Sequence, residues 1–119
     1  MKSLDNKSFM MLFDEGKDLF NQEKIHEAHL TWEKIWKHGD KDARKNIKGF
    51  IQLSGSLLNQ SYGKQKAAEY LMEKAKNNIM ESEMFSNKVN VRNIVQQINE
   101  FIVFTHDGVC CGSSVTITL

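Results

Sequence analysis

Proline is absent from the 119-residue sequence, and cysteine is scarce. Because proline is the main breaker of helix interiors, its absence leaves long uninterrupted helices unhindered. The only cysteines, Cys110 and Cys111, are adjacent and close to the end of the sequence. Two neighbouring cysteines form neither a disulfide framework nor a CxxC zinc motif, so we expect reduced thiols.

Long apolar runs and an excess of one charge are missing as well. No segment approaches the roughly 20 consecutive apolar residues of a membrane-spanning helix. The polar start, MKSLDNKSF, lacks the apolar core of a signal peptide. With 16 basic and 15 acidic residues the formal net charge is +1, which provides no strong field for nucleic acid. We therefore expect a soluble, cytoplasmic protein with neither a membrane nor a nucleic acid as its partner.

Helical periodicity is what the sequence does contain. In five segments the apolar residues recur every three or four positions, which indicates amphipathic helices. The expected helices cover about residues 9–20, 25–38, 42–61, 64–79 and 90–104. Gly39 and Gly63 suit helix ends, and Asp40 or Asp42 suits the N-cap of the third helix.

Similar spacing in the two halves suggests two related hairpins. Gly16 and Gly55 are 39 positions apart (55 − 16 = 39), and so are Ala28 and Ala67 (67 − 28 = 39). Small residues at these positions let antiparallel helices approach closely, as in tetratricopeptide-like hairpins. We predict an all-α fold, a compact bundle of about five helices made of two such hairpins and a closing helix.

The last segment, DGVCCGSSVTITL, changes from helical periodicity to a glycine- and serine-rich composition followed by β-branched residues. Since no partner strand is predicted elsewhere, we expect residues 107–119 to form a flexible C-terminal tail. Residues 1–106 then form a single helical domain. A short strand or a partner-binding extension is the alternative for the tail.

The segment IHEAHLTWEKIWK, residues 25–37, concentrates histidine, glutamate and tryptophan. We place it on a helical wheel at about 100° per residue with Ile25 as the centre of the buried stripe. The wheel predicts a buried stripe of Ala28, His29, Trp32 and Trp36, a flank of His26 and Glu33, and an opposite position for Glu27. Both tryptophans are expected in the core, where large aromatic side chains supply much of the buried area.

An inward-facing His29 needs hydrogen-bond partners for both ring nitrogens, and Glu33, one helical turn on, can accept one bond. Three interpretations remain open. His29 can be a core histidine that fixes helix packing. It can be a base oriented by Glu33, as in acid–base chemistry. It can share a metal with His26 and Glu33, although the flank position of His26 makes convergence poor.

A polar stripe on the third helix adds Lys48, Gln52 and Asn59. If this stripe faces the second helix, Gln52 and Asn59 can line one groove together with His26 and Glu33. An ordinary solvated surface is the alternative.

Four segments also carry a family resemblance, and they occur in the order FDEGKDLFN (13–21), EAHLTWEKIW (27–36), KGFIQL (48–53) and YGKQKAA (62–68). They resemble a small helical family of bacteria, archaea and plastid-bearing organisms, the domain of unknown function numbered three hundred and nine. Its pattern reads roughly G-x-x-L-F-N, E-A-H-E-x-x-E-x-x-W, G-L-I-Q and H-x-x-x-G-N. The resemblance covers about residues 9–80 and implies an all-helical bundle, without implying any reaction.

The polar and aromatic positions of the family pattern are matched by Glu27, His29, Glu33, Trp36 and Gln52. The sequence departs from the pattern at three positions. Leu30 replaces a glutamate, Asn59 replaces a histidine, and Lys64 replaces an asparagine. Losing a carboxylate and an imidazole removes the partners that His29 would use for metal binding or proton transfer.

We therefore predict a helical module that binds a protein partner or a small ligand at a polar groove near His29, Glu33 and Gln52. The predicted binding residues are Glu27, His29, Glu33, Trp36, Gln52 and Asn59. No cofactor and no metal is expected, and an enzyme is not the leading interpretation. One alternative is a small hydrolase-like or metal-assisted enzyme that uses His29 and Glu33. Another is a purely structural bundle that self-associates.

Overall fold

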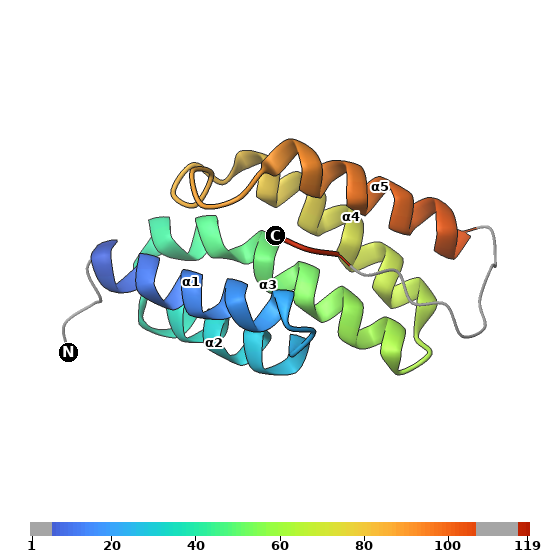
Figure 1. The fold of residues 1–119 in the computed structure, drawn as a ribbon, viewed down its shortest axis with the longest axis horizontal. Coiled ribbons are helices and arrows are strands. Elements are labelled where there is room, and N and C mark those ends of the chain that lie inside the picture. Colours follow the sequence, from blue (N-terminus) through green and yellow to red (C-terminus); the bar gives the residue numbers. More distant parts are fainter. Residues whose placement is uncertain (1–5, 107–116) are drawn as a thin grey trace.

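The computed structural model describes residues 6–106 and 117–119, and its regular structure is helical throughout (Figure 1). The helices are α1 (Asn6–Asn21), α2 (Ile25–His38), α3 (Lys41–Ser61), α4 (Gln65–Glu81) and α5 (Val91–His106). The prediction of an all-α fold with five helices is confirmed, and the bounds of α2 are those predicted. The described residues contain no strand, and none of their helices has the length and apolar character needed to cross a membrane.

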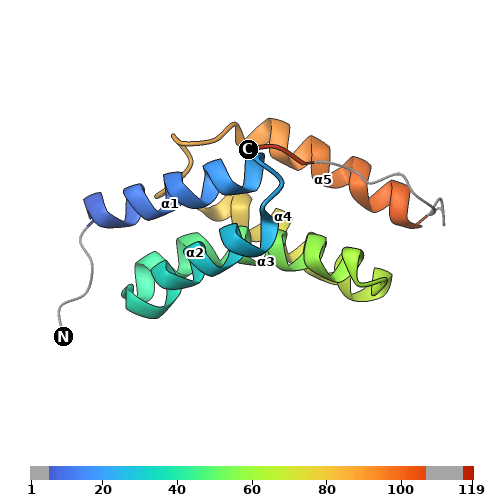
Figure 2. The same ribbon diagram turned by 60° about the horizontal axis from the view of Figure 1, so that its bottom comes forward.

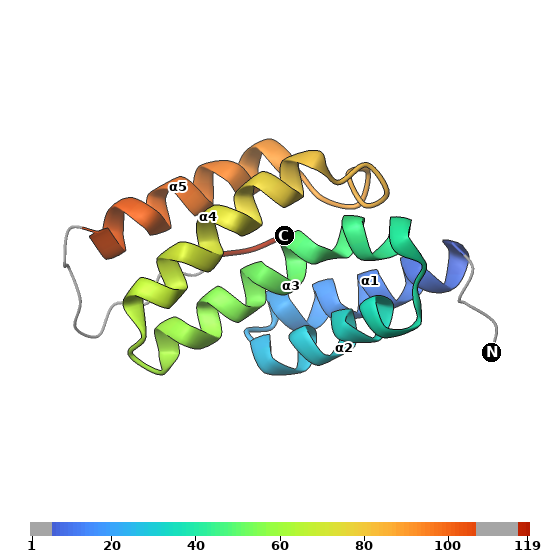
Figure 3. The same ribbon diagram turned by 180° about the vertical axis from the view of Figure 1, so that it is seen from behind.

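Consecutive helices pack against each other, and α4 lies between α3 and α5 when the molecule is seen from behind (Figure 3). In Figure 2, α1 and α5 lie on one side of the molecule, and α2 and α3 lie on the other. The first hairpin, α1–α2, therefore meets the second, α3–α4, along the contact between α2 and α3.

The turns of the two hairpins have the same conformation. Glu23 and Gly63 both have positive φ angles, 65° and 79°, and they are 40 residues apart (63 − 23 = 40). The following residues, Lys24 and Lys64, each donate a backbone hydrogen bond of 2.9 Å to the carbonyl five residues earlier. The structural repeat is therefore one residue longer than the 39 positions predicted from the sequence.

This change of register alters which residues are equivalent. Ala28 is buried and corresponds to Ala68, which is also buried, whereas Ala67 is exposed. Gly16 corresponds to Ser56, whose buried hydroxyl donates a hydrogen bond to the carbonyl of Ala68. The tetratricopeptide-like character of the hairpins stays a prediction.

Aromatic rings form the centre of the core, around the fully buried Trp32. Its indole centroid lies 5.9 Å from Phe13, 5.6 Å from Phe20 and 5.7 Å from Phe50. The indole N–H donates a hydrogen bond of 3.3 Å to the backbone carbonyl of Phe13. A buried indole needs such a partner, so this bond fixes the orientation of Trp32 between α1 and α3.

The loop between α4 and α5 closes one end of this core. Phe85 stacks on Phe13 with centroids 4.4 Å apart. The buried Asn46 of α3 accepts hydrogen bonds from the backbone N–H groups of Glu83 (2.8 Å) and Met84 (3.0 Å). Ser82 donates its hydroxyl hydrogen to the carbonyl of Asn46 at 3.0 Å. One amide side chain therefore fixes the start of the loop on α3.

The buried face of α2 is rotated relative to the prediction. Ala28, Thr31, Trp32 and Ile35 are buried, Ile25 is only partly buried, and Trp36 is 40% exposed. The centre of the stripe lies close to Ala28 and Ile35, roughly 70° from Ile25 on a helical wheel. The prediction that Trp36 belongs to the core is therefore wrong, because Ile25 does not mark the centre of the buried stripe.

Most of the predicted tail, residues 107–119, lies outside the described residues. Residues 117–119 are described, and they lie between the end of α1 and α5 (Figure 2). Ile117 is 2% exposed and belongs to the hydrophobic core.

Candidate functional site

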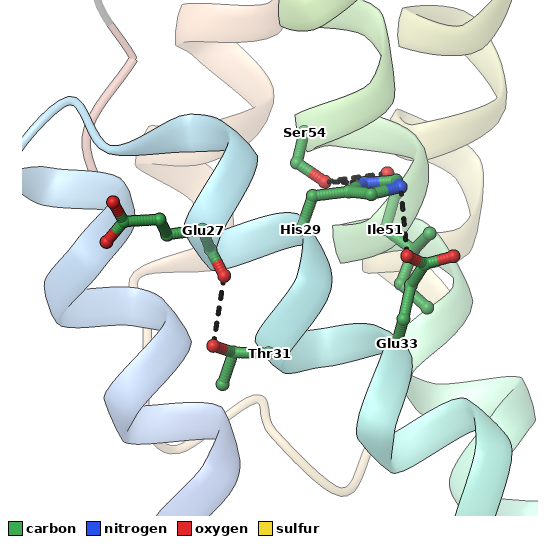
Figure 4. Close-up of polar contacts among 6 residues, drawn as sticks. All are labelled: Glu27, His29, Thr31, Glu33, Ile51 and Ser54. Atoms are coloured by element: carbon green, nitrogen blue, oxygen red, sulfur yellow. Dashed lines mark hydrogen bonds and ion pairs between the residues drawn. The ribbon is translucent and has the colours of Figure 1, made fainter.

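His29 lies where α2 of the first hairpin meets α3 of the second (Figure 4). Its Nδ1 is 2.6 Å from the hydroxyl oxygen of Ser54, and its Nε2 is 3.7 Å from a carboxylate oxygen of Glu33. The His29 side chain is 21% exposed and that of Glu33 is 51% exposed. The imidazole therefore points inward toward α3, as predicted. It is only partly buried, however, because His29 lies at the edge of the rotated stripe and its Nε2 edge remains close to the surface.

The hydrogen bonds of Ser54 determine which ring nitrogen carries hydrogen. The hydroxyl of Ser54 donates to the carbonyl of Ile51 at 2.8 Å, a bond that uses its only hydrogen. Its oxygen then accepts from Nδ1–H of His29. In the neutral ring Nε2 is consequently an acceptor, and it lies beside the carboxylate of Glu33. If the ring gains a second proton, Nε2–H and Glu33 form an ion pair.

Ser54, His29 and Glu33 contain the residue types of a nucleophile, a base and an orienting acid. Ser54, however, is fully buried, and its hydrogen is bonded to the helix backbone. A nucleophile must contact a substrate carbonyl, and a buried hydroxyl has no such access in this arrangement. The geometry instead favours a contact that holds α2 against α3.

Metal binding would need several converging ligands. Across residues 6–106 and 117–119, no three His, Cys, Asp or Glu side chains are grouped closely enough to hold a metal ion, and this includes His26, His29 and Glu33. His26 is exposed on the flank of α2, in agreement with its predicted position.

Gly55 of α3 lies next to side chains of both α2 and α4. A Cβ atom at Gly55 would lie 3.8 Å from Cε1 of His29 and 3.7 Å from Cδ1 of Leu71, which belongs to α4. α2 and α4 therefore both pack against α3 at this position, and the groove itself stays a prediction.

The amides predicted to line the groove are engaged within the protein. The side-chain oxygen of Gln52 accepts a hydrogen bond of 2.7 Å from Asn78 of α4. Asn59 donates to the carbonyl of Gly55 at 2.8 Å, within α3. These contacts join Gln52 to α4 and Asn59 to its own helix, so they do not bring either residue to His29.

Glu27 and His29 point to different sides of α2 (Figure 4). The Glu27 side chain is exposed, and its backbone carbonyl accepts a hydrogen bond of 2.9 Å from the hydroxyl of Thr31. Glu27 is thus separated from the pair formed by His29 and Glu33.

Trp36 contacts Arg44, which was not among the predicted site residues. The Nε–H of Arg44 donates a hydrogen bond of 2.9 Å to the backbone carbonyl of Trp36. The guanidinium carbon of Arg44 lies 5.7 Å from the centroid of the Trp36 ring, a cation–π distance. Both side chains are exposed. The sequence signal for this contact was the helix-ending Gly39 followed by the basic residues Lys41, Arg44, Lys45 and Lys48.

Together the fold and this region define an all-helical protein of two α-hairpins and a fifth helix, with a polar contact at the junction of the hairpins. The sequence model of the Domain of unknown function (DUF309) matches residues 13–71, from α1 to the middle of α4. Through this segment the chain belongs to the DUF309 family, as the four motifs indicated. Searches of the curated proteins and of the solved structures found no match to the chain.

Proposed function

We propose that the chain is a protein-binding module whose contact surface is the outward face of α2 together with the start of α3. The observation that carries the proposal is the exposed Trp36, which Arg44 covers at 5.7 Å while it donates to the Trp36 carbonyl. Leu30, on the same helix, is 47% exposed. Exposed tryptophan and leucine side chains on a small domain are suited to be covered by a partner.

Tryptophan and arginine are the residue types that most often dominate protein–protein binding energy. The bond between Arg44 and the Trp36 carbonyl restrains the arginine before any partner arrives. Restraint in the free protein lowers the entropy that must be lost on binding. An arginine placed over a tryptophan ring also keeps its outer N–H groups available, and these groups can bind the carboxylate of a partner through two parallel hydrogen bonds.

The charges around this pair favour an acidic segment of the partner. Lys37 adjoins Trp36, and Lys48 follows Arg44 by one helical turn on α3; both are exposed. Glu33 precedes Trp36 by about one turn on α2 and repels a second acid at that end of the surface. The binding partner is therefore expected to place an acidic side chain at Arg44 and an apolar one on Trp36.

In this proposal His29 is a positioning residue. Its bond of 2.6 Å to Ser54 joins α2 to α3, and α2 carries Trp36 while α3 carries Arg44. Holding the two helices in register keeps the stacked pair assembled. Gln52, through Asn78, joins α3 to α4 in a corresponding way.

A displayed library of random dodecapeptides, selected on the intact chain and counter-selected on the Trp36→Ala/Arg44→Ala variant, tests the proposal. We expect enriched peptides that pair an acidic residue with an aromatic or aliphatic neighbour. Their affinity should fall at least tenfold with Arg44→Gln. It should change less than twofold with Arg92→Gln, which removes an exposed arginine of the distant α5.

A selection without an acidic consensus, or peptides that bind Arg44→Gln and the unaltered chain equally well, would contradict the proposal. Circular dichroism of each variant separates a loss of binding from a loss of folding. His29→Ala should weaken both binding and stability, whereas Arg44→Gln should weaken binding alone.

A further inference from the structure

Residues 117–119 lie as a short extended segment between α1 and α5 (Figure 1). The N–H of Thr118 donates to the side-chain oxygen of Gln97 at 2.9 Å, and the side-chain NH₂ of Gln97 donates to the carbonyl of Thr118 at 2.8 Å. Asn21 makes the same pair of contacts with Leu119, at 2.8 Å and 3.3 Å. The side-chain amides of Asn21 on α1 and Gln97 on α5 therefore each bind both the N–H and the C=O of one residue in the segment.

These hydrogen bonds are made to the backbone of the segment and not to its side chains. Each amide offers one donor and one acceptor to the N–H and C=O of one residue, as a neighbouring strand does in a β-ladder. Recognition through the main chain gives affinity for any extended segment, while sockets for alternate side chains give selectivity. Gln97 is also held by its own helix, since its NH₂ group donates to the side chain of Asn93 at 2.7 Å.

The side chains of the segment alternate as in a strand. Ile117 is buried in the core, Thr118 is exposed, and Leu119 is partly buried against the core. This alternation has the period of two that is expected of an extended chain. The burial of Ile117 and Leu119 consequently favours an apolar residue at the first and third positions, with a polar one tolerated between them.

An open hollow of about 700 Å³ adjoins the same segment. Its lining includes Lys17, Lys88, Asn90 and Asn93 beside Thr118 and Leu119. Lys17 donates to the backbone carbonyl of Lys88 at 2.6 Å, and this contact ties α1 to the loop before α5. The space next to Thr118 and Leu119 can accommodate further residues of a bound chain.

From this geometry we infer that the groove between α1 and α5 is a binding site for an extended peptide. The peptide has the pattern apolar–any–leucine, with a β-branched residue first. Asn21 and Gln97 bind its backbone, and residues 117–119 occupy the site within the same chain. A segment of a partner protein with this pattern competes with residues 117–119 for the groove. The site is separate from the Trp36–Arg44 surface, so the two proposals can fail independently.

A peptide with the sequence of residues 115–119, Val-Thr-Ile-Thr-Leu, with a neutral fluorophore on its N-terminal amine and a C-terminal amide, tests the inference by fluorescence anisotropy. The probe carries no terminal charge, so only the backbone and side-chain contacts are measured. In the intact chain the internal segment competes at an effective concentration on the order of millimolar. Ile117→Asp should release that segment, and the probe should then bind roughly tenfold more tightly.

Gln97→Ala in the Ile117→Asp background should reduce probe binding at least tenfold. Gln96→Ala serves as the matched control, because Gln96 is an exposed glutamine on the same helix that contacts Glu100. A probe with aspartate in place of isoleucine should not bind. Thr118→Pro provides a second way to release the segment. It removes the N–H that donates a hydrogen bond to the side-chain oxygen of Gln97, and it leaves Ile117 unchanged.

The inference is overturned if the probe binds neither Ile117→Asp nor Thr118→Pro while both variants keep the circular dichroism of the unaltered chain. Equal effects of Gln97→Ala and Gln96→Ala would overturn it as well. If Ile117→Asp loses its helical signal, the result with Thr118→Pro decides.

Discussion

Replacing Gly16 and Gly55 by alanine should change the stability of the protein in opposite directions, although the two glycines look equivalent in the sequence. A Cβ atom at Gly16 would lie 2.3 Å from Nε1, 2.6 Å from Cδ1 and 2.8 Å from Cε2 of Trp32. At Gly55 the nearest atoms would be Leu71 Cδ1 at 3.7 Å and His29 Cε1 at 3.8 Å, which are ordinary contacts. Only the first substitution therefore forces a movement of the surrounding atoms.

The magnitude follows from what surrounds Trp32. The indole is fully buried, lies within 6 Å of three phenylalanine rings by centroid, and donates to the carbonyl of Phe13. Inserting a methyl group into such packing costs about 1–3 kcal/mol, and a displaced indole also loses about 1 kcal/mol of hydrogen bonding. Replacing glycine by alanine inside a helix returns about 1 kcal/mol. Gly16→Ala should therefore destabilise the protein by about 1–3 kcal/mol.

For Gly55→Ala no packing cost offsets the helix preference of alanine. We expect a stabilisation of about 0.5–1 kcal/mol. Urea and thermal unfolding followed by far-UV circular dichroism measure both changes. At roughly 4 °C per kcal/mol for a chain of this size, the two midpoints should move apart by several degrees, with the unaltered chain between them.

A double-mutant cycle with Trp32→Phe isolates the cause. Phenylalanine lacks the pyrrole part of the indole, so the methyl group at position 16 then meets fewer atoms. The cost of Gly16→Ala should be lower by at least 1 kcal/mol in the Trp32→Phe background. Equal costs in both backgrounds, or shifts of the same sign for Gly16→Ala and Gly55→Ala, would refute the packing argument.

Two further predictions concern the core and the surface. Asn46→Ala should destabilise the protein by about 2–4 kcal/mol in urea unfolding, because the N–H groups of two loop residues lose their acceptor; an unchanged midpoint would contradict this. Trp36 emission should be quenched by iodide and Trp32 emission should not, since 40% of Trp36 and none of Trp32 is exposed. Comparing Trp32→Phe with Trp36→Phe separates the two signals, and protected emission from Trp36 would refute its surface position.

The helices could be predicted because each one buries a single stripe of apolar residues. Residues of such a stripe recur every three or four positions in the sequence. Local polar signals also indicated the start of α3, since Asp40, one of the two predicted N-cap candidates, accepts a hydrogen bond of 2.9 Å from the N–H of Ala43. The centre of a stripe is harder to predict than its period. On α2 the apolar residues Ile25 and Trp36 widen the pattern, and only the position of α1 and α3 decides that Ala28 and Ile35 lie at its centre.

The repeat illustrates the same limit. Its period was predicted as 39 because glycines and alanines matched at that spacing, while the turns show 40. Gly16 makes room for Trp32, but the residue in the equivalent position, Ser56, contacts the Ala68 backbone through its hydroxyl. Small residues meet the need for close approach in different ways, so matching them by type misplaces the register by one residue.

In the candidate site the local pair was predictable and its distant partner was not. His29 and Glu33 are four residues apart on one helix, whereas Ser54 is 25 residues from His29 in the sequence. A serine such as Ser54 among the apolar residues of a helix indicates that another helix packs closely there. It does not identify the side chain that the serine will contact. The contact of Arg44 with Trp36 depends in the same way on the turn between α2 and α3.

The residues that match the family pattern therefore fall into two groups with different expected behaviour. His29 and Gln52 direct their polar atoms to other helices, through Ser54 and Asn78. Glu27, Glu33 and Trp36 are exposed. A loss of binding in His29→Ala is then not evidence that His29 contacts the partner, because the substitution also releases α2 from α3. Only a substitution that weakens binding at constant stability, as we expect for Trp36, identifies a residue of the contact surface.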